Sequence, residues 1–333
     1  MERMSAFAVK RPASLVEAAA LLAAEPGARL VAGGTGLIPN LRRGIERPAT
    51  LIDLGAVQSF ATIEPNADGL SLGAGVTLAR LAADARISGP YRAIAEAARA
   101  VAGPSHRQAA TLGGNLCLDT RCVFYNQSEW WRAANDYCLK RGGEVCHVAP
   151  QGKHCHAAFS GDVAPALLAL GAEVEVMSSR GTRCVELSAL YRDDGAAHLT
   201  LAADELLARV HVRQPPAGLV SGYRKACARG AIDFPLAGVA CALRIDAGVL
   251  AELRVALTGT NSRPFVVEST DALLGRPVAE DTLAALAKLV QKQVSPMRTT
   301  VTQSNYRRQV AAALAQRLVR ELASPDRGDA PRR

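Results

Sequence analysis

A glycine-rich turn between a short apolar strand and a helix is the feature that most constrains the fold of this chain. The segment RLVAGGTGLIPNLRRG places the glycines at positions 33, 34 and 36 directly after the predicted strand and before a helical stretch. Because glycine has no Cβ, closely spaced glycines let main-chain N–H groups converge on an anion such as a phosphate. The spacing matches neither the GxGxxG dinucleotide fingerprint nor a P-loop. Taken alone, the pattern therefore favours an ordinary turn over a phosphate site.

A second glycine turn, TLGGN at residues 111–115, follows a polar approach and a predicted helix. It is as unspecific as the first turn when it is considered alone. Two such turns in one chain strengthen the hypothesis that both serve one extended phosphate-containing ligand.

The hydrophobic pattern divides the chain into three predicted domains. Residues 1–57 form a small strand and helix unit, in which Ser14 and Glu17 have the spacing of a capping box. Residues 58–217 repeat strand and helix patterns and end at the linker QPPAG. Residues 218–333 contain two strands around a turn at 246–248, then two helices near 279–293 and 304–323. The expected fold class is α+β, with two N-terminal α/β subdomains and a C-terminal antiparallel sheet covered by helices.

The charge and hydropathy patterns exclude some classes of function. The formal net charge is +8, but the excess is scattered and no nucleic-acid recognition motif accompanies it. The longest apolar runs are shorter than the ~20 residues of a membrane span, and the first residues lack the apolar core of a signal peptide. We therefore expect a cytoplasmic protein that binds neither nucleic acid nor a membrane, and whose clustered thiols bind metal rather than pair.

The most unusual segment is RCVFYNQSEWWRAANDYCLKRGGEVCHVAPQGKHCH at residues 121–156, which contains four of the eight cysteines and both tryptophans. Cys122, Cys138, Cys146 and Cys155 are spaced C-x15-C-x7-C-x8-C. Four thiolates suit either tetrahedral zinc or an iron–sulfur cluster. No CxxC knuckle is present, so the spacing slightly favours the cluster, and disulfides are the less favoured alternative.

The other residues of the cysteine segment have less specific interpretations. Its histidines, His147, His154 and His156, could replace a cysteine at zinc, but surface or supporting positions are favoured. The aromatic side chains of Phe124, Tyr125, Trp130, Trp131 and Tyr137 are expected to pack the loop and to shield a metal from water. Outside the segment, Cys184, Cys227 and Cys241 lie in apolar contexts and are predicted to be buried.

Three motifs together, VAGGTGLIPNLRRG, ATLGGNLC and GDVAPALLALGA, resemble the FAD-binding medium subunit of molybdenum hydroxylases. This is the family of xanthine dehydrogenase and carbon monoxide dehydrogenase. The resemblance continues through YRKACARGAIDFPLAGVACAL and SNYRRQVAAAL, and so covers nearly the whole chain. It implies an FAD-binding fold of the vanillyl-alcohol-oxidase and molybdenum-hydroxylase type, with FAD between the two N-terminal subdomains and a third domain over them.

The resemblance also implies cofactor-binding positions. Residues 30–37 would surround the pyrophosphate, residues 111–115 would hold its other side, and Asp162 would accept hydrogen bonds from FAD hydroxyls. The full set is Leu30, Val31, Ala32, Gly33, Gly34, Thr35, Gly36, Leu37, Val101, Thr111, Leu112, Gly113, Gly114, Asn115, Asp162, Leu207 and Lys225. The family usually has an acidic residue where this chain has Gly36, so one side-chain contact to FAD is expected to be missing.

The cysteine segment, with TRCVFYNQSEWWR and the following GDVAPAL, resembles one branch of the family, the β subunit of 4-hydroxybenzoyl-CoA reductase. That subunit carries a 4Fe–4S cluster in an inserted loop, here expected at about 117–160. The resemblance implies that Cys122, Cys138, Cys146 and Cys155 bind the cluster and that Cys117 does not. The chain itself would contain no catalytic residue, because the reductive dehydroxylation to benzoyl-CoA would take place on a partner subunit.

The same branch implies partners. Ferredoxin would supply electrons through the cluster and FAD to a small 2Fe–2S subunit and a large molybdenum-cofactor subunit, in a heterohexamer built as a dimer of heterotrimers. Two alternatives stay open. One is the FAD subunit of an oxidising molybdenum hydroxylase with a zinc or accessory cluster loop, and the other is a non-enzymatic zinc-loop interaction protein.

Overall fold

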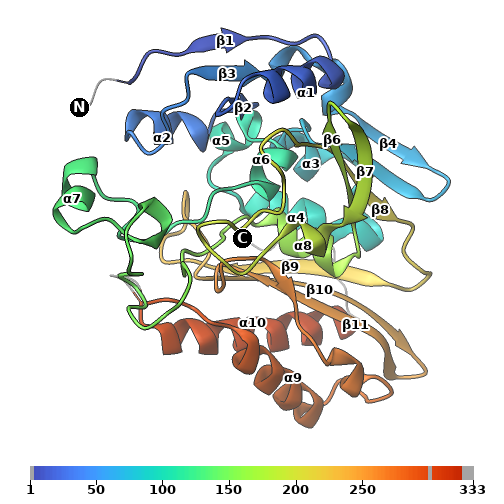
Figure 1. The fold of residues 1–333 in the computed structure, drawn as a ribbon. Coiled ribbons are helices and arrows are strands. Elements are labelled where there is room, and N and C mark those ends of the chain that lie inside the picture. The colour runs from blue at the N-terminus through green and yellow to red at the C-terminus, as the bar shows by residue number, and fades with distance from the viewer. Residues whose placement is uncertain (1–3, 299–301, 325–333) are drawn as a thin grey trace.

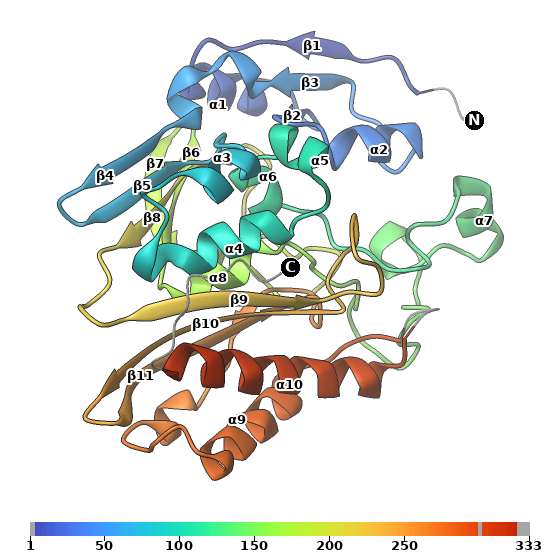
Figure 2. The ribbon, with the colours of Figure 1, turned by 180° about the vertical axis from the view of Figure 1, so that it is seen from behind.

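The computed structural model describes residues 4–298 and 302–324 of the chain (Figure 1). The described residues form a small parallel sheet, a five-stranded antiparallel sheet and a four-stranded antiparallel sheet. Figure 2 shows the small sheet at one end of the molecule and the last two long helices at the other, with the remaining elements between them.

The small sheet has the order β1-β3-β2 and is parallel throughout. Its elements are β1 (Ala8–Lys10), α1 (Leu15–Ala24), β2 (Arg29–Val31), α2 (Leu37–Arg42) and β3 (Thr50–Asp53). The Ser14 hydroxyl accepts the N–H of Glu17 at 3.1 Å, and this cap starts α1 where the sequence predicted it.

The five-stranded sheet has the order β4-β5-β8-β6-β7. Its strands are β4 (Ile63–Asn66), β5 (Gly69–Gly73), β6 (Glu173–Ser178), β7 (Gly181–Glu186) and β8 (Leu206–Arg213). The helices of this part are α3 (Leu78–Ala83), α4 (Arg92–Ala100), α5 (Pro104–Ala109), α6 (Leu112–Leu116) and α8 (Val163–Ala169). Short 3-10 turns are η1 (Leu54–Ala56), η2 (Gln58–Ala61), η3 (Gly89–Tyr91) and η5 (Leu187–Leu190). Strand β8 pairs with β5 on one side and with β6 on the other, and so joins the hairpin β4-β5 to the hairpin β6-β7. The complete sheet therefore forms only when segments that are far apart in the sequence pair.

The cysteine segment is an insertion between α6 and α8. Its two ends are held together by a pair of main-chain hydrogen bonds between Arg121 and Ala158, at 3.0 and 2.9 Å. The segment contains helix α7 (Glu129–Ala134) and the 3-10 turn η4 (Leu139–Arg141). In both ribbon views α7 projects away from the rest of the molecule.

The four-stranded sheet has the order β12-β11-β10-β9 and two different faces. Its strands are β9 (Val220–Ala226), β10 (Ala237–Asp246), β11 (Val249–Thr258) and β12 (Phe265–Val266), followed by η6 (Thr270–Leu273), α9 (Glu280–Gln293) and α10 (Ser304–Ala323). On β10, Val239 and Cys241 belong to the core under α9 and α10, whereas Ala240 and Ala242 belong to the core shared with the N-terminal part. This alternation follows from the two-residue period of a strand.

The expected fold class, α/β units followed by an antiparallel sheet with helices, is confirmed. The boundaries proposed for the three domains stay predictions. Among the described residues, no helix is both long and apolar enough to cross a bilayer.

Candidate flavin and cysteine sites

The first glycine turn connects β2 to α2 and packs against a segment from the second predicted subdomain. A Cβ on Gly33 would lie 1.8 Å from the main-chain oxygen of Ala109, so only glycine fits there. Gly34 has φ +68°, a conformation that side chains rarely adopt. At Gly36 the nearest atom to an added Cβ would be Leu118 Cδ1, at 3.8 Å, which is ordinary contact. The turn is thus fixed by its first two glycines and has room at the third.

The second glycine turn uses its main-chain donors inside the protein. Leu112 donates to Val76 at 2.9 Å and Gly113 to Ala74 at 2.7 Å, while Gly114 and Asn115 donate to the side-chain and main-chain oxygens of Thr111. This segment is the N-terminus of α6, capped by Thr111. The N–H groups of residues 112–115 therefore already have acceptors inside the protein, and the placing of residues 111–115 beside the pyrophosphate stays a prediction. A ligand here could instead accept hydrogen bonds from the Thr111 hydroxyl or the Asn115 side-chain NH2, since their oxygens accept from Gly114 and Val163.

Val163, the residue after Asp162, is hydrogen-bonded to the second glycine turn. The Asn115 side-chain oxygen accepts the N–H of Val163 at 3.0 Å. The Asp162 carboxyl is 3% exposed, accepts the Tyr223 hydroxyl at 2.6 Å and lies 3.2 Å from Lys225 Nζ. Burial raises its pKa to about 6, although Lys225 and Tyr223 both act to lower it.

Lys225, Val101 and Leu207 are further predicted cofactor positions, and they differ in burial. Lys225 Nζ donates to the carbonyl of Ala100 at 3.0 Å, which brings β9 beside the half-buried Val101 at the end of α4. Leu207 is 5% exposed within β8 and belongs to the hydrophobic core. Val101 is therefore placed beside the Asp162 cluster, whereas Leu207 offers little surface to a ligand.

The four cysteines at positions 122, 138, 146 and 155 line one small cavity, together with Phe124, Leu139, Lys140, His147 and Val148. All eight cysteines of the chain are free thiols in this structure. Within residues 4–298 and 302–324, no three His, Cys, Asp or Glu side chains are arranged closely enough to hold a single metal ion. The convergence of four separate cysteines on one cavity is a result of the tertiary structure, because the sequence shows only their spacing.

Main-chain hydrogen bonds fix the backbone at Cys138 and at Cys155 in different ways. The carbonyl of Cys138 accepts from Arg141 at 2.7 Å and from Gly143 at 3.0 Å. A Cβ on Gly143 would lie 2.6 Å from the Asp136 carbonyl, so this turn also requires glycine. The carbonyl of Cys155 accepts the N–H of Gly195 at 2.7 Å. Cys155 is therefore fixed by a segment outside the insertion.

Burial and N–H donors have opposite effects on the pKa of two of these thiols, Cys122 and Cys155. Burial raises the pKa of the Cys155 thiol to about 11, while the N–H of Ala157, 3.4 Å from Sγ, and the charge of Lys140 act to lower it. Burial likewise raises the pKa of Cys122, whose Sγ accepts the N–H of Tyr125 at 3.3 Å. N–H donors aimed at sulfur stabilise a thiolate, the form that binds metal.

Several predictions for side chains in and near this segment need correction. Trp130 is 71% exposed on α7 and shields nothing, whereas Tyr125 is 4% exposed and Phe124 lines the cavity. The expected burial of Cys184 and Cys227 is wrong, since both are exposed, and Cys241 is buried as predicted. Cys184 is exposed because β7 forms the edge of its sheet. Apolar neighbours in sequence do not distinguish an edge strand from a central one.

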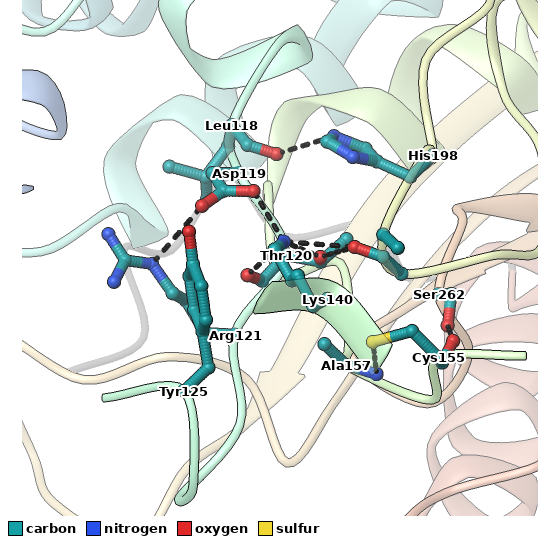
Figure 3. Close-up of polar contacts among 12 residues, drawn as sticks. Leu118, Asp119, Thr120, Arg121, Tyr125, Lys140, Cys155, Ala157, His198 and Ser262 are labelled. Atoms are coloured by element: carbon teal, nitrogen blue, oxygen red, sulfur yellow. Dashed lines mark hydrogen bonds and ion pairs between the residues drawn. The ribbon is translucent and has the colours of Figure 1, made fainter. Parts of the chain in front are cut away.

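Two buried basic residues of the cysteine segment, Lys140 and Arg132, were missed by sequence reasoning. The Lys140 side chain is 7% exposed and its Nζ donates to Asp119 Oδ1 at 2.6 Å and to the carbonyls of Thr120 and Gly195, each at 2.9 Å (Figure 3). Arg132, 2% exposed, donates to the carbonyls of Tyr125 and Gln127 and so holds the loop before α7. Both are single basic residues in a polar stretch, and no sequence signal marks them.

Comparison with known proteins identifies the family. Residues 5–215 match the model of the FAD binding domain in molybdopterin dehydrogenase, and residues 222–322 match the CO dehydrogenase flavoprotein C-terminal domain. The aldehyde oxidoreductase FAD-binding subunit PaoB of Escherichia coli (strain K12) is 34% identical over 295 residues, 85% of this chain and 91% of that protein. The xanthine dehydrogenase FAD-binding subunit of Escherichia coli O157:H7 is 26% identical and covers 94% of this chain and 95% of its own length.

Solved structures agree with this assignment at the level of the fold. A chain of the cyanide-inactivated Cu,Mo-CO dehydrogenase superposes with a TM-score of 0.80 at 23% identity, covering 97% of this chain and 99% of that one. A chain of quinoline 2-oxidoreductase from Pseudomonas putida 86 gives a TM-score of 0.77 at 25% identity, covering 97% and 98%. The chain therefore belongs to the family of FAD-binding subunits of molybdopterin dehydrogenases, and it is an oxidoreductase subunit, as its sequence predicted.

Proposed function

We propose that this chain is the electron-transfer subunit of a molybdenum-dependent oxidoreductase and carries a 4Fe–4S cluster in addition to FAD. The observation that carries the proposal is the convergence of Cys122, Cys138, Cys146 and Cys155 on one cavity. When bound, the cluster supplies one-electron transfer and FAD couples one-electron to two-electron steps. The chain's own residues then bind, orient and shield these groups.

The flavin part of the proposal is supported by the contact between the two glycine turns. Gly33 packs on Ala109, two residues before Thr111, so the phosphate-binding candidates of both subdomains lie side by side. Gly34 and Gly36 are in the same turn as Gly33, and because they have no side chains a ligand could approach their backbone. On the other side, Asp162 is held by Tyr223 and Lys225 and would accept hydrogen bonds from FAD hydroxyls. The residues present fit the cofactor that the family binds.

The cluster part of the proposal is supported by the chemistry of the donor set. Four thiols surround one cavity, and two of them accept main-chain N–H donors, from Tyr125 to Cys122 and from Ala157 to Cys155. Hydrogen bonds to cysteine sulfur are among the factors that set the potential of an iron–sulfur cluster. Both Cys138 and Cys146 are buried, which limits the access of water to the ligands.

For the enzyme as a whole, we propose a complex with a large molybdenum-cofactor subunit and a small 2Fe–2S subunit, arranged as a dimer of heterotrimers. The named relatives include an aldehyde oxidoreductase, a xanthine dehydrogenase and a carbon monoxide dehydrogenase medium chain. The 34% identity to the aldehyde oxidoreductase subunit favours an oxidising enzyme that acts on an aldehyde. Electrons would then leave the partner subunits through this chain.

A second candidate is the 4-hydroxybenzoyl-CoA reductase role, in which electrons from ferredoxin enter through the cluster. It is favoured by the likeness of TRCVFYNQSEWWR and the four cysteines to that branch of the family. The two candidates differ in the direction of electron flow. Activity assays with an aromatic aldehyde and with 4-hydroxybenzoyl-CoA plus reduced ferredoxin would separate them.

The proposal is tested by isolating the complex without oxygen and measuring its FAD, iron and acid-labile sulfide per copy of this chain. EPR spectra before and after dithionite then report the cluster. The expected result is a reducible iron–sulfur signal that disappears in Cys138→Ser while FAD is retained. Zinc in place of iron, or a Cys138→Ser variant with the full wild-type signal, would overturn the cluster assignment.

A further inference from the structure

The lysine beside the cysteine cavity has no role in the function proposed so far. Lys140 follows Cys138 by two residues and lines the same cavity as the four thiols. Among the described residues that line this cavity, it is the one lysine or arginine. Its side chain is 7% exposed, so the charge is shielded from solvent rather than placed at the surface.

Lys140 is held in place by oxygens from two separate segments. Its ammonium donates to Asp119 and Thr120, which follow the second glycine turn, and to the Gly195 carbonyl, at 2.6, 2.9 and 2.9 Å respectively. Its Nζ also lies 4.6 Å from the centre of the Tyr125 ring. Gly195 in turn donates its N–H to the carbonyl of Cys155. The cation therefore has one fixed position relative to a cysteine of the cavity.

The counter-charge of Lys140 is partly shared. Asp119 also lies 3.9 Å from Arg121 Nε, and its Oδ2 is buried without a hydrogen-bond partner among the described residues. One carboxylate thus faces two cations, and Asp119 is not among the residues that line the cavity. The positive charge of Lys140 is incompletely balanced on the side of the thiols.

A fixed cation at this position has a definite electrostatic consequence. One-electron reduction adds a negative charge to a cluster, and a nearby buried cation stabilises that charge because little water screens it. We propose that Lys140 is a positioning residue that raises the reduction potential of the cluster. The inference rests on the proposed function, since it requires a cluster at the four cysteines.

The segment that anchors Lys140 also reaches the first glycine turn. Leu118 approaches Gly36 of the first glycine turn, and its carbonyl accepts from His198 Nε2 at 2.9 Å. Asp119 and Thr120, the anchors of Lys140, are the next two residues. The anchors of Lys140 are therefore continuous in the chain with a residue that lies against the first glycine turn of the proposed flavin site.

The test is an anaerobic redox titration of the complex followed by EPR, in which the cluster signal is the one lost in Cys138→Ser. Lys140→Met, which removes the charge at similar length, is expected to shift the midpoint potential to more negative values. Asp119→Asn keeps an acceptor for Lys140 and removes the counter-charge, so it should shift the potential in the positive direction. Lys153→Met is the matched control, because Lys153 is exposed and lies two residues from Cys155; its potential should equal that of the wild type.

The outcomes separate the inference from the proposed function. If no Cys138-dependent iron–sulfur signal exists, the proposed function fails and the inference fails with it. A normal signal whose potential is unchanged in both Lys140→Met and Asp119→Asn would overturn the inference alone. If Lys140→Met does not retain its cluster, the potential of Asp119→Asn is used instead, and a positive shift supports the inference while an unchanged potential overturns it. Lys140→Arg should then restore both the cluster content and the potential. An equal shift in Lys153→Met would show a general charge effect and would also refute the role of Lys140.

Discussion

Gly33 and Ala109 touch through their backbones: a Cβ on Gly33 would lie 1.8 Å from the Ala109 main-chain oxygen. These residues come from the two predicted N-terminal subdomains, so their contact joins the first glycine turn to the segment just before the second. Glycine is therefore required at position 33 because a side chain would collide with the Ala109 backbone, and not because the position has a positive φ.

The first prediction concerns this contact. Gly33→Ala should displace the first turn from Ala109, which lowers the free energy of unfolding by ~1–3 kcal/mol and reduces the FAD content. The measurements are thermal unfolding and FAD released per chain. Gly36→Ala is the matched control, since its nearest neighbour would be at 3.8 Å; it should keep both values near those of the wild type. Equal losses in the two variants would contradict the packing argument.

The second prediction concerns position 36, where the family resemblance implies an acidic residue and this chain has Gly36. Gly36→Asp should fold normally, because Leu118 is the nearest group and has an ordinary contact distance. If the side chain recovers the contact to FAD expected in the family, the variant retains FAD more tightly. The measurement is the rate of FAD release during dilution. Release faster than in Gly36→Ala would contradict the expectation.

The third prediction concerns pH. Burial raises the pKa of Asp162 to about 6, so the folded apoprotein holds a proton there at pH values where an unfolded aspartate is ionised. The ionised carboxylate is the better acceptor for FAD hydroxyls, and FAD affinity should therefore rise as the pH increases through about 6. Below this pH we expect roughly tenfold weaker retention, the loss of one charge-assisted hydrogen bond. Ultrafiltration followed by flavin fluorescence, between about pH 5 and pH 8, measures it.

Asp162→Asn is the control for that pH dependence. It should bind FAD weakly across the range and show no rise near pH 6, since the titrating group is gone. A variant with the same slope as the wild type would assign the pH effect to another group.

The fourth prediction concerns the cysteines. Cys138→Ser should lose most of the bound iron and sulfide and keep its FAD, because Cys138 lines the cysteine cavity and the flavin candidates lie elsewhere. Cys227→Ser is the control, since Cys227 is exposed and outside the cavity. Metal and flavin analysis of both variants after anaerobic purification checks the result. Iron loss in Cys227→Ser to the same extent would contradict the choice of ligands.

The fifth prediction concerns stability of the C-terminal part. Arg307 on α10 is 3% exposed and donates to the carbonyls of Leu236, Met297 and Gly259. Arg307→Met leaves these buried acceptors unpaired and should lower the free energy of unfolding by roughly 3 kcal/mol. Arg320→Met, on the exposed face of the same helix, should change it by less than about 0.5 kcal/mol. Urea denaturation of the two variants gives the comparison.

Local signals in the sequence predicted the elements that depend on neighbours in the chain. Helix α1 starts at the Ser14 cap, and α9 and α10 occupy nearly the ranges that their hydrophobic period indicated. The family resemblance likewise depends on short motifs, such as VAGGTGLIPNLRRG and ATLGGNLC, that are contiguous in the chain. These predictions succeeded because capping and helical periodicity involve residues only a few positions apart.

Strands β4, β7, β8 and β9 were not predicted as such. Strands β4 and β7 form hairpins with their chain neighbours β5 and β6, whereas β8 needs partners from distant segments. Strand β8 pairs with β5 and β6, and the sequence of β8 contains no mark of either pairing. The same reason explains the error at Cys184, whose exposure depends on β7 being an edge.

For the cysteine site, too, some properties follow from the sequence and others only from the tertiary structure. The sequence by itself determined the family, the four cysteines and the soft donor set, because residue type decides which metal chemistry is possible. Only the tertiary structure decided that the four thiols share one cavity, that Gly195 fixes Cys155, and that Lys140 is buried beside them. Burial and convergence depend on contacts between segments far apart in the chain, and a spacing pattern contains no information about those contacts.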